Sequence, residues 1–179
     1  LTILLEKCSL EEITGTVGNL LAKLKLSATE MLAALFGKYS LDAVISSLGQ
    51  LKTGLSMTAS DMLNAIFSNY LIMDIVESAR DIVGQLLDIT PADVLSAIIE
   101  RAEVSRALLS SIVENFDLED IAENLREILA NLDWDLDVHG AVDIILRQFQ
   151  LDEIMQLLGK FVDELSEGAY SIVDFLDDV

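Results

Sequence analysis

The fold is decided by the stretch Ser27-Ala28-Thr29-Glu30-Met31-Leu32, which recurs as Thr58-Ala59-Ser60-Asp61-Met62-Leu63 and as Thr90-Pro91-Ala92-Asp93-Val94-Leu95. The second copy begins 31 residues after the first, and the third begins 32 residues after the second. Repeats of this length are typical of small helical units that stack, because a unit of two helices cannot bury its apolar face alone. The sequence therefore predicts internal repeats that start near residues 27, 58 and 90.

Each copy carries the signals of a helix start. Ser27 and Glu30 have the spacing of a capping box, in which each side chain bonds the backbone N–H of the other residue. Thr58 and Asp61 form a shorter version of the same pair. Pro91, which is the only proline of the chain, falls at the first helical position, where a missing N–H has no consequence. We therefore expect helices to begin at these three points.

Apolar residues between the repeat starts follow the i, i+3, i+4, i+7 spacing of helices with one buried face. One set predicts a second helix after Ser40, and the residues 72–87 predict another, with Leu87 pointing inward. Gly54 is expected in a loop. Gly84 is expected inside a helix, where a close approach of another helix would explain it. A further set predicts a long helix that includes Ile154 and Gly159.

The predicted fold class is all-α. We expect a multi-helix bundle or a short array of two-helix repeats, with about nine to eleven amphipathic helices around one continuous apolar core. The 179 residues contain no linker rich in Pro, Gly or Ser, so residues 1–179 are predicted to form a single domain.

Composition combines an apolar interior with a strongly acidic surface. Hydrophobic residues make up 52% of the chain, the mean hydropathy is +0.46, and the formal net charge is -20. Residues 1–60 hold five basic and five acidic residues, whereas residues 61–179 hold 6 basic and 26 acidic ones. Such a surface repels nucleic acids and anionic lipids, so we expect no nucleic-acid partner. The alternative is that the acidic part only keeps an apolar protein in solution.

Several features bear on the compartment. The chain begins at Leu1 rather than Met, which predicts a processed or excised product, with an extracellular location favoured. The longest uncharged run, residues 62–73, is too short to span a bilayer, so no transmembrane span is predicted. Cys8 is the only cysteine, and we expect it to be reduced and half-buried near the first helix. A disulfide to another chain is the alternative.

The residue types needed for known catalytic sites are scarce. His139 is the only histidine, and no nucleophile elbow, phosphate loop or dinucleotide fingerprint is present. The segment 133–140, Asp-Trp-Asp-Leu-Asp-Val-His-Gly, is similar to the start of an EF-hand loop, but Val138 and Ile144 stand where glycine and glutamate are required. We interpret it as a helix start capped by Asp133 or Asp135, with Trp134 and Leu136 packed. We predict no enzyme, no cofactor and no metal.

Matching repeat positions carry Met and Phe residues that are typical of a core and also suit the lining of an apolar cavity. The predicted ligand-lining residues are Met31, Leu35, Phe36, Met62, Ile66, Phe67, Ile98 and Ile99. We therefore expect a non-enzymatic protein that binds lipids or other hydrophobic or amphipathic small molecules, or that acts at a membrane or air–water interface. The alternative is a structural, self-associating module of a larger repetitive secreted protein, which forms homo-oligomers. A third hypothesis is a helical scaffold that binds a basic partner on its acidic face.

Overall fold

The computed structural model describes residues 2–157, and it confirms the all-α fold class. Fourteen helices lie between Thr2 and Gln148, more than the nine to eleven predicted, and residues 151–157 are also helical. The chain divides into two compact units, Leu1–Thr90 and Pro91–Val179. The prediction of one domain with one continuous core stays a prediction. Gly159 lies outside the described residues.

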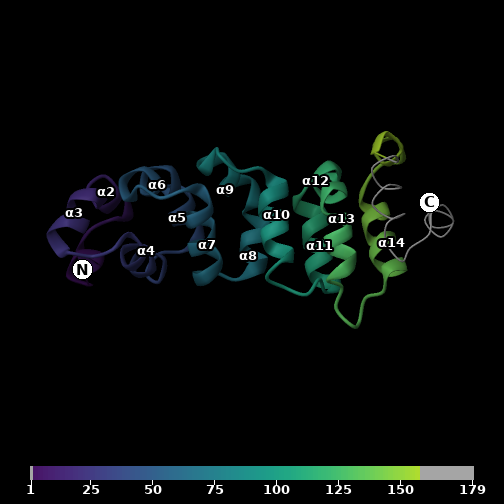
Figure 1. Ribbon diagram of the computed structural model, residues 1–179, viewed down its shortest axis with the longest axis horizontal. Coiled ribbons are helices and arrows are strands. Elements are labelled where there is room, and N and C mark those ends of the chain that lie inside the picture. Colours follow the sequence, from purple (N-terminus) through teal and green to yellow (C-terminus); the bar gives the residue numbers. More distant parts are fainter. Residues whose placement is uncertain (1, 158–179) are drawn as a thin grey trace. The chain divides into compact units, whose positions relative to one another are not determined.

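Unit 1 contains nine short helices (Figure 1). They are α1 (Thr2–Lys7), α2 (Leu10–Thr14), α3 (Val17–Leu24), α4 (Ala28–Phe36), α5 (Leu41–Ile45), α6 (Leu48–Leu55), α7 (Ala59–Asn69), α8 (Ile72–Glu77) and α9 (Ala79–Leu86).

The repeat of unit 1 has three helices instead of two, because the second helices predicted after Ser40 and over residues 72–87 are each divided. The breaks fall at Thr16, Ser47 and Ser78, where φ lies between -128° and -99° and ψ is close to 0°. This backbone conformation interrupts a helix, but the helices before and after the break still bury side chains on the same side. The apolar spacing therefore continues across the breaks at Ser47 and Ser78, which is why the sequence pattern predicted one longer helix in each of these two places.

A second feature recurs with the same period. Lys25, Ser56 and Leu87, each 31 residues apart, follow α3, α6 and α9 and have φ values of 55°, 54° and 57°. This left-handed conformation ends a helix but is unfavourable for residues with a side chain. Leu87 was predicted to point inward. That prediction was wrong, because the helix ends at Leu86 and the left-handed turn leaves Leu87 82% exposed.

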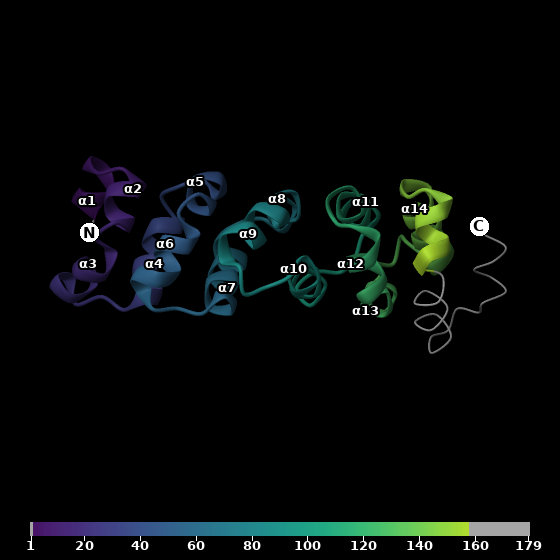
Figure 2. The ribbon, with the colours of Figure 1, turned by 90° about the horizontal axis from the view of Figure 1, so that it is seen from above.

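Equivalent helices of successive repeats contact one another in rows. Helix α3 packs on α6 and α6 packs on α9, while α4 packs on α7. Figure 2 shows α2, α5 and α8 in a further row along one edge of this unit. The Tyr39 hydroxyl donates to the Cys8 carbonyl (3.1 Å), and the Tyr70 hydroxyl donates to the Tyr39 carbonyl (2.9 Å). Cys8 itself is half-buried, as expected.

Two glycines differ from their predicted roles. Gly54 lies inside α6 rather than in a loop, and a Cβ at this position would come within 2.4 Å of the Val17 Cγ1 atom on α3. Gly84 lies inside α9 as predicted, but a Cβ there would meet no atom within 4 Å. The close approach of two helices therefore occurs at Gly54, between α3 and α6, and not at Gly84, where it was predicted.

Between Pro91 and Gln148, unit 2 has five named helices, and their connectivity differs from that of unit 1. They are α10 (Pro91–Ile99), α11 (Arg106–Asn115), α12 (Leu118–Glu123), α13 (Leu125–Ala130) and α14 (Val138–Gln148). Helix α10 packs on α12 and α13, whereas α11 packs on α14. An isolated parallel bridge joins Val104 to Leu132, so the loop before α11 is fastened to the loop after α13.

Candidate functional site

The eight predicted lining residues lie in or next to the core. Seven of them are at most 3% exposed, namely Met31, Leu35, Phe36, Met62, Ile66, Ile98 and Ile99, and Phe67 is half-buried. Phe36 also contacts the ring of Tyr70, with centroids 5.7 Å apart, and burial raises the pKa of Tyr70 to about 12. None of the eight lines either groove described below. Their role in ligand binding stays a prediction.

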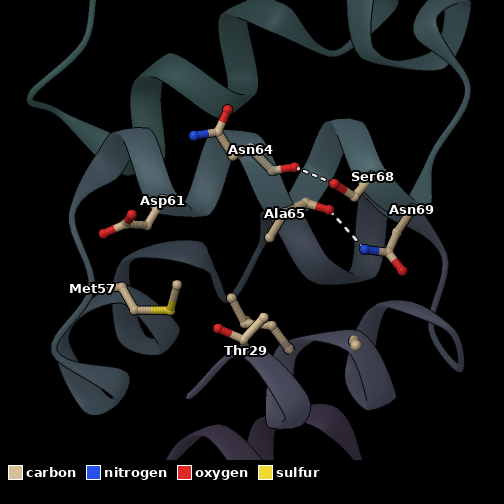
Figure 3. A pocket seen from close by; sticks show the side chains of 9 residues that line it. Thr29, Met57, Asp61, Asn64, Ala65, Ser68 and Asn69 are labelled. Atoms are coloured by element: carbon tan, nitrogen blue, oxygen red, sulfur yellow. Dashed lines mark hydrogen bonds between the residues drawn. The ribbon is translucent and has the colours of Figure 1, made fainter. Parts of the chain in front are cut away.

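One candidate site is a groove between α4 and α7, here called the α4–α7 groove (Figure 3). It has a volume of about 330 Å³ and is lined by Thr29, Leu32, Ala33, Met57, Asp61, Asn64, Ala65, Ser68 and Asn69. Met57 and Asp61 lie at one end, and Ser68 and Asn69 lie at the other (Figure 3). The groove therefore results from the repetition, because α4 and α7 are equivalent helices of successive repeats within unit 1.

The groove exists because small side chains face each other where the two helices approach. On α7 the lining residues have the spacing i, i+3, i+4, i+7, i+8 from Asp61, which places them on one helix face. On α4 they have the spacing i, i+3, i+4 from Thr29. Ala33 and Ala65 contribute only methyl groups to the lining, and the buried Leu32 also lines the groove.

The polar groups of the groove are mostly engaged with their own helix. The Ser68 hydroxyl donates to the Asn64 carbonyl, and the Asn69 amide nitrogen donates to the Ala65 carbonyl, both at 2.8 Å (Figure 3). The wall thus has polar atoms at its rim and methyl and methylene groups below. The apolar part of a ligand could contact the methyl and methylene groups, and its polar head group could lie at the solvent-exposed rim.

Asp61 gives the groove one fixed negative charge. Its carboxylate accepts from the Thr58 hydroxyl (2.6 Å) and from the Thr58 backbone N–H (3.0 Å), so the pair is a full capping box. The Thr58 side-chain bond, followed by the backbone bond, lowers the pKa of Asp61. A carboxyl with a lowered pKa is ionised at neutral pH. The end of the groove that contains Met57 is therefore anionic.

A second groove lies between α5 and α9, but its chemistry is less selective. It has a volume of about 400 Å³ and is lined by Asp42, Ile45, Ser46, Arg80, Asp81, Gly84 and Gln85. Charged and amide side chains dominate this lining, and Ile45 is its only large apolar residue. It suits water and ions better than an apolar ligand.

The third repeat exposes apolar side chains where the earlier repeats have polar ones. Leu71 is 72% exposed and occupies the position of Ser40, and exposed Met73 occupies the position of Asp42. Leu87 likewise occupies the position of Ser56. An exposed leucine in a left-handed conformation adds nothing to the stability of the fold, and such outliers cluster at functional surfaces.

The aspartate-rich segment before α14 differs from its prediction. The cap of α14 is Asp137, which accepts from the Gly140 N–H at 2.8 Å, and neither Asp133 nor Asp135 caps it. Leu136 packs in the core as expected, but Trp134 is 94% exposed, so the prediction that it packs was wrong. Within the described residues, no group of His, Cys, Asp or Glu side chains is arranged to hold a metal ion.

No protein-family model, curated protein or solved structure matches this chain. In the part of the chain that the structure describes, every helix is too short or too polar to cross a bilayer.

Proposed function

We propose that this chain is a non-enzymatic binding protein for amphiphiles that have a neutral or cationic head group, and that the α4–α7 groove is the binding site. The observation that carries this proposal is the lining of the groove, where small apolar side chains lie beneath a polar rim that bears the ionised Asp61.

The size and chemistry of the groove support this ligand class. Small-molecule sites are concave and mostly apolar with a few placed polar groups, and they have volumes of about 300–1,000 Å³. The groove lies at the low end of that range, which suits one alkyl chain rather than a whole phospholipid. A tail of this kind would pack on Leu32, Ala33 and Ala65, and its head would lie near Asp61.

Charge favours a neutral or cationic head over an anionic one. The chain has a net charge of -20, and Asp61 is the only charged residue in the groove lining. A cationic head group beside the Asp61 carboxylate gains a solvent-screened attraction, whereas an anionic head group is repelled. The groove is therefore expected to prefer alkylammonium amphiphiles to fatty acid anions.

The test compares decyltrimethylammonium with decanoate by calorimetric titration below their critical micelle concentrations. The variant Ala33→Leu/Ala65→Leu fills the groove, and Ala22→Leu on α3 is the matched control, since Ala22 is exposed and outside the groove. Loss of roughly 50 Å² of apolar contact should weaken binding about tenfold. The control should bind like the wild type. Equal affinity of the filled variant and the wild type would refute the site.

The apolar residues of the third repeat favour a second candidate function, which is self-association. Leu71, Met73 and Leu87 replace polar residues, and burying them between copies would explain their exposure. The variant Leu71→Ser/Met73→Asp/Leu87→Ser restores the residue types of the second repeat without touching the core. Sedimentation velocity should show wild-type oligomers that grow with concentration and a monomeric variant. A wild type that stays monomeric at all concentrations removes this candidate.

A further inference from the structure

Trp134 is the most exposed of the large hydrophobic residues in the described chain, yet its backbone is held in place. The Leu136 N–H donates to the Asp133 carbonyl (3.0 Å), so Trp134 occupies the second position of a hydrogen-bonded turn. An Asp133 carboxylate oxygen also accepts from the Trp134 N–H (2.7 Å). The indole is thus presented to water from a closed turn.

Both ends of this turn are anchored to the body of unit 2. On one side, Val104 donates to the Asn131 carbonyl (2.7 Å) and accepts from the Asp133 N–H (3.1 Å). On the other side, Leu136 is buried and Asp137 caps α14. Anchoring lowers the entropy that is lost when a partner binds, because the backbone is already ordered. An exposed tryptophan on such a turn has the properties of a binding anchor.

The surroundings of Trp134 are acidic. Asp133 and Asp135 flank it in the chain, and residues 127–146 contain no lysine or arginine. Arg106 lies near the start of α14, where its Nη2 atom would be 3.5 Å from a Cβ at Gly140. Residues 91–157 as a whole hold fifteen acidic and four basic residues. The surface therefore favours a cation and disfavours phosphate groups.

We propose that Trp134, with Asp133 and Asp135, is the docking site for an arginine side chain presented by a basic segment of a partner protein. The planar guanidinium stacks on an indole face and at the same time donates to carboxylates in a forked geometry. A lysine ammonium has the same charge but neither the plane nor the fork. The site therefore distinguishes arginine from lysine, which a diffuse negative surface does not.

The experiment uses the full chain and three synthetic peptides of equal length that carry arginine, lysine or neutral citrulline at the same positions. Trp134 is the only tryptophan, so its fluorescence and its quenching by acrylamide report on this site alone. The arginine peptide should shield the indole, the lysine peptide should bind several-fold more weakly, and the citrulline peptide should not shield it.

Variants separate a local site from general attraction by net charge. With a labelled arginine peptide, Trp134→Ala should weaken binding about tenfold, and Asp135→Asn should weaken it about threefold. Asp152→Asn removes the same charge from an exposed position elsewhere in unit 2 and should leave binding unchanged. Equal effects of Asp135→Asn and Asp152→Asn would overturn the proposal, as would equal affinities of the arginine and lysine peptides. Shielding of Trp134 by phosphatidylcholine vesicles but not by the arginine peptide would also overturn it, in favour of a lipid surface.

Discussion

The two units use similar helix starts but are held together differently. In unit 1, one break and one left-handed residue recur every 31 residues, so that equivalent helices stack in rows. In unit 2, a bridge between Val104 and Leu132 links distant loops, and α11 packs on α14. Unit 1 is also less acidic, with ten acidic and six basic residues in 1–90 against fifteen acidic and four basic residues in 91–157. Repetition produces a groove between equivalent helices, whereas the irregular unit presents an anchored turn with an exposed tryptophan.

The largest expected effect comes from the centre of the stack in unit 1. Leu51 lies on α6, which contacts α2, α3, α7 and α9, and its side chain is fully buried. Leu51→Ala should reduce the free energy of unfolding by about 2–5 kcal/mol, because it leaves a cavity. Hydrogen exchange should show faster exchange in α2–α9, with α10–α14 unaffected if the units unfold separately. Equal acceleration in both units would contradict the division.

The next effect tests the close approach of α3 and α6. Gly54→Ala places a Cβ against Val17, and overpacking of this kind costs about 1–3 kcal/mol. Gly84→Ala is the matched control, because it adds the same methyl group to a helix of the same unit where no atom is near. It should stabilise the protein by about 0.5–1 kcal/mol. Urea unfolding measures both, and stabilisation by Gly54→Ala would show that the helices do not meet there.

A smaller effect tests the capping box beside the groove. Thr58→Ala should cost about 1 kcal/mol at neutral pH, whereas Ser40→Ala should cost less, because Ser40 makes no side-chain cap bond. The Thr58 bonds lower the pKa of Asp61 from its usual 3.8, so their contribution is present above that value and is lost as pH falls through the lowered pKa. The cost of Thr58→Ala should therefore shrink as the pH falls below 3.8. If the loss of stability caused by Thr58→Ala did not depend on pH, the ionised Asp61 carboxylate would not contribute to the cap.

The smallest effect concerns the left-handed residue of the third repeat. Leu87→Gly should stabilise unit 1 by about 0.5–1 kcal/mol, because glycine adopts a positive φ without steric conflict and the exposed leucine contributes little packing. Thermal unfolding measures the change. A clear loss of stability would mean that the Leu87 side chain makes contacts that its exposure does not show.

The sequence predicted the features that depend on local chemistry. The caps at Ser27 and Thr58 and the helix start at Pro91 all form, because they need only residues that lie three positions apart. The helix breaks at Thr16, Ser47 and Ser78 gave no signal, since the apolar spacing continues through them. These three breaks, together with a similar one at Asn124 between α12 and α13, raise the number of helices above the prediction.

The candidate sites were harder to predict than the core. The large apolar residues chosen as ligand-lining are buried, whereas the groove is lined in part by alanine, serine and asparagine. A groove forms where side chains are small, and small residues give little hydrophobic signal in a sequence. Their spacing on α7, from Asp61 to Asn69, is the signal that could have revealed them. The exposure of Trp134 depends on the contacts of Leu136 and Val104, which are not local.

The most direct test of amphiphile binding in the α4–α7 groove is an NMR titration of the methionine methyl groups with decyltrimethylammonium. The five methionines sample separate environments, because Met57 lines the groove, Met31 and Met62 are buried, and Met73 and Met155 are exposed elsewhere. The proposal predicts a saturable shift of Met57 alone. Shifts of Met31 and Met62 would place the ligand in the interior, shifts confined to Met73 and Met155 would place it on the outer surface, and either result would contradict the groove.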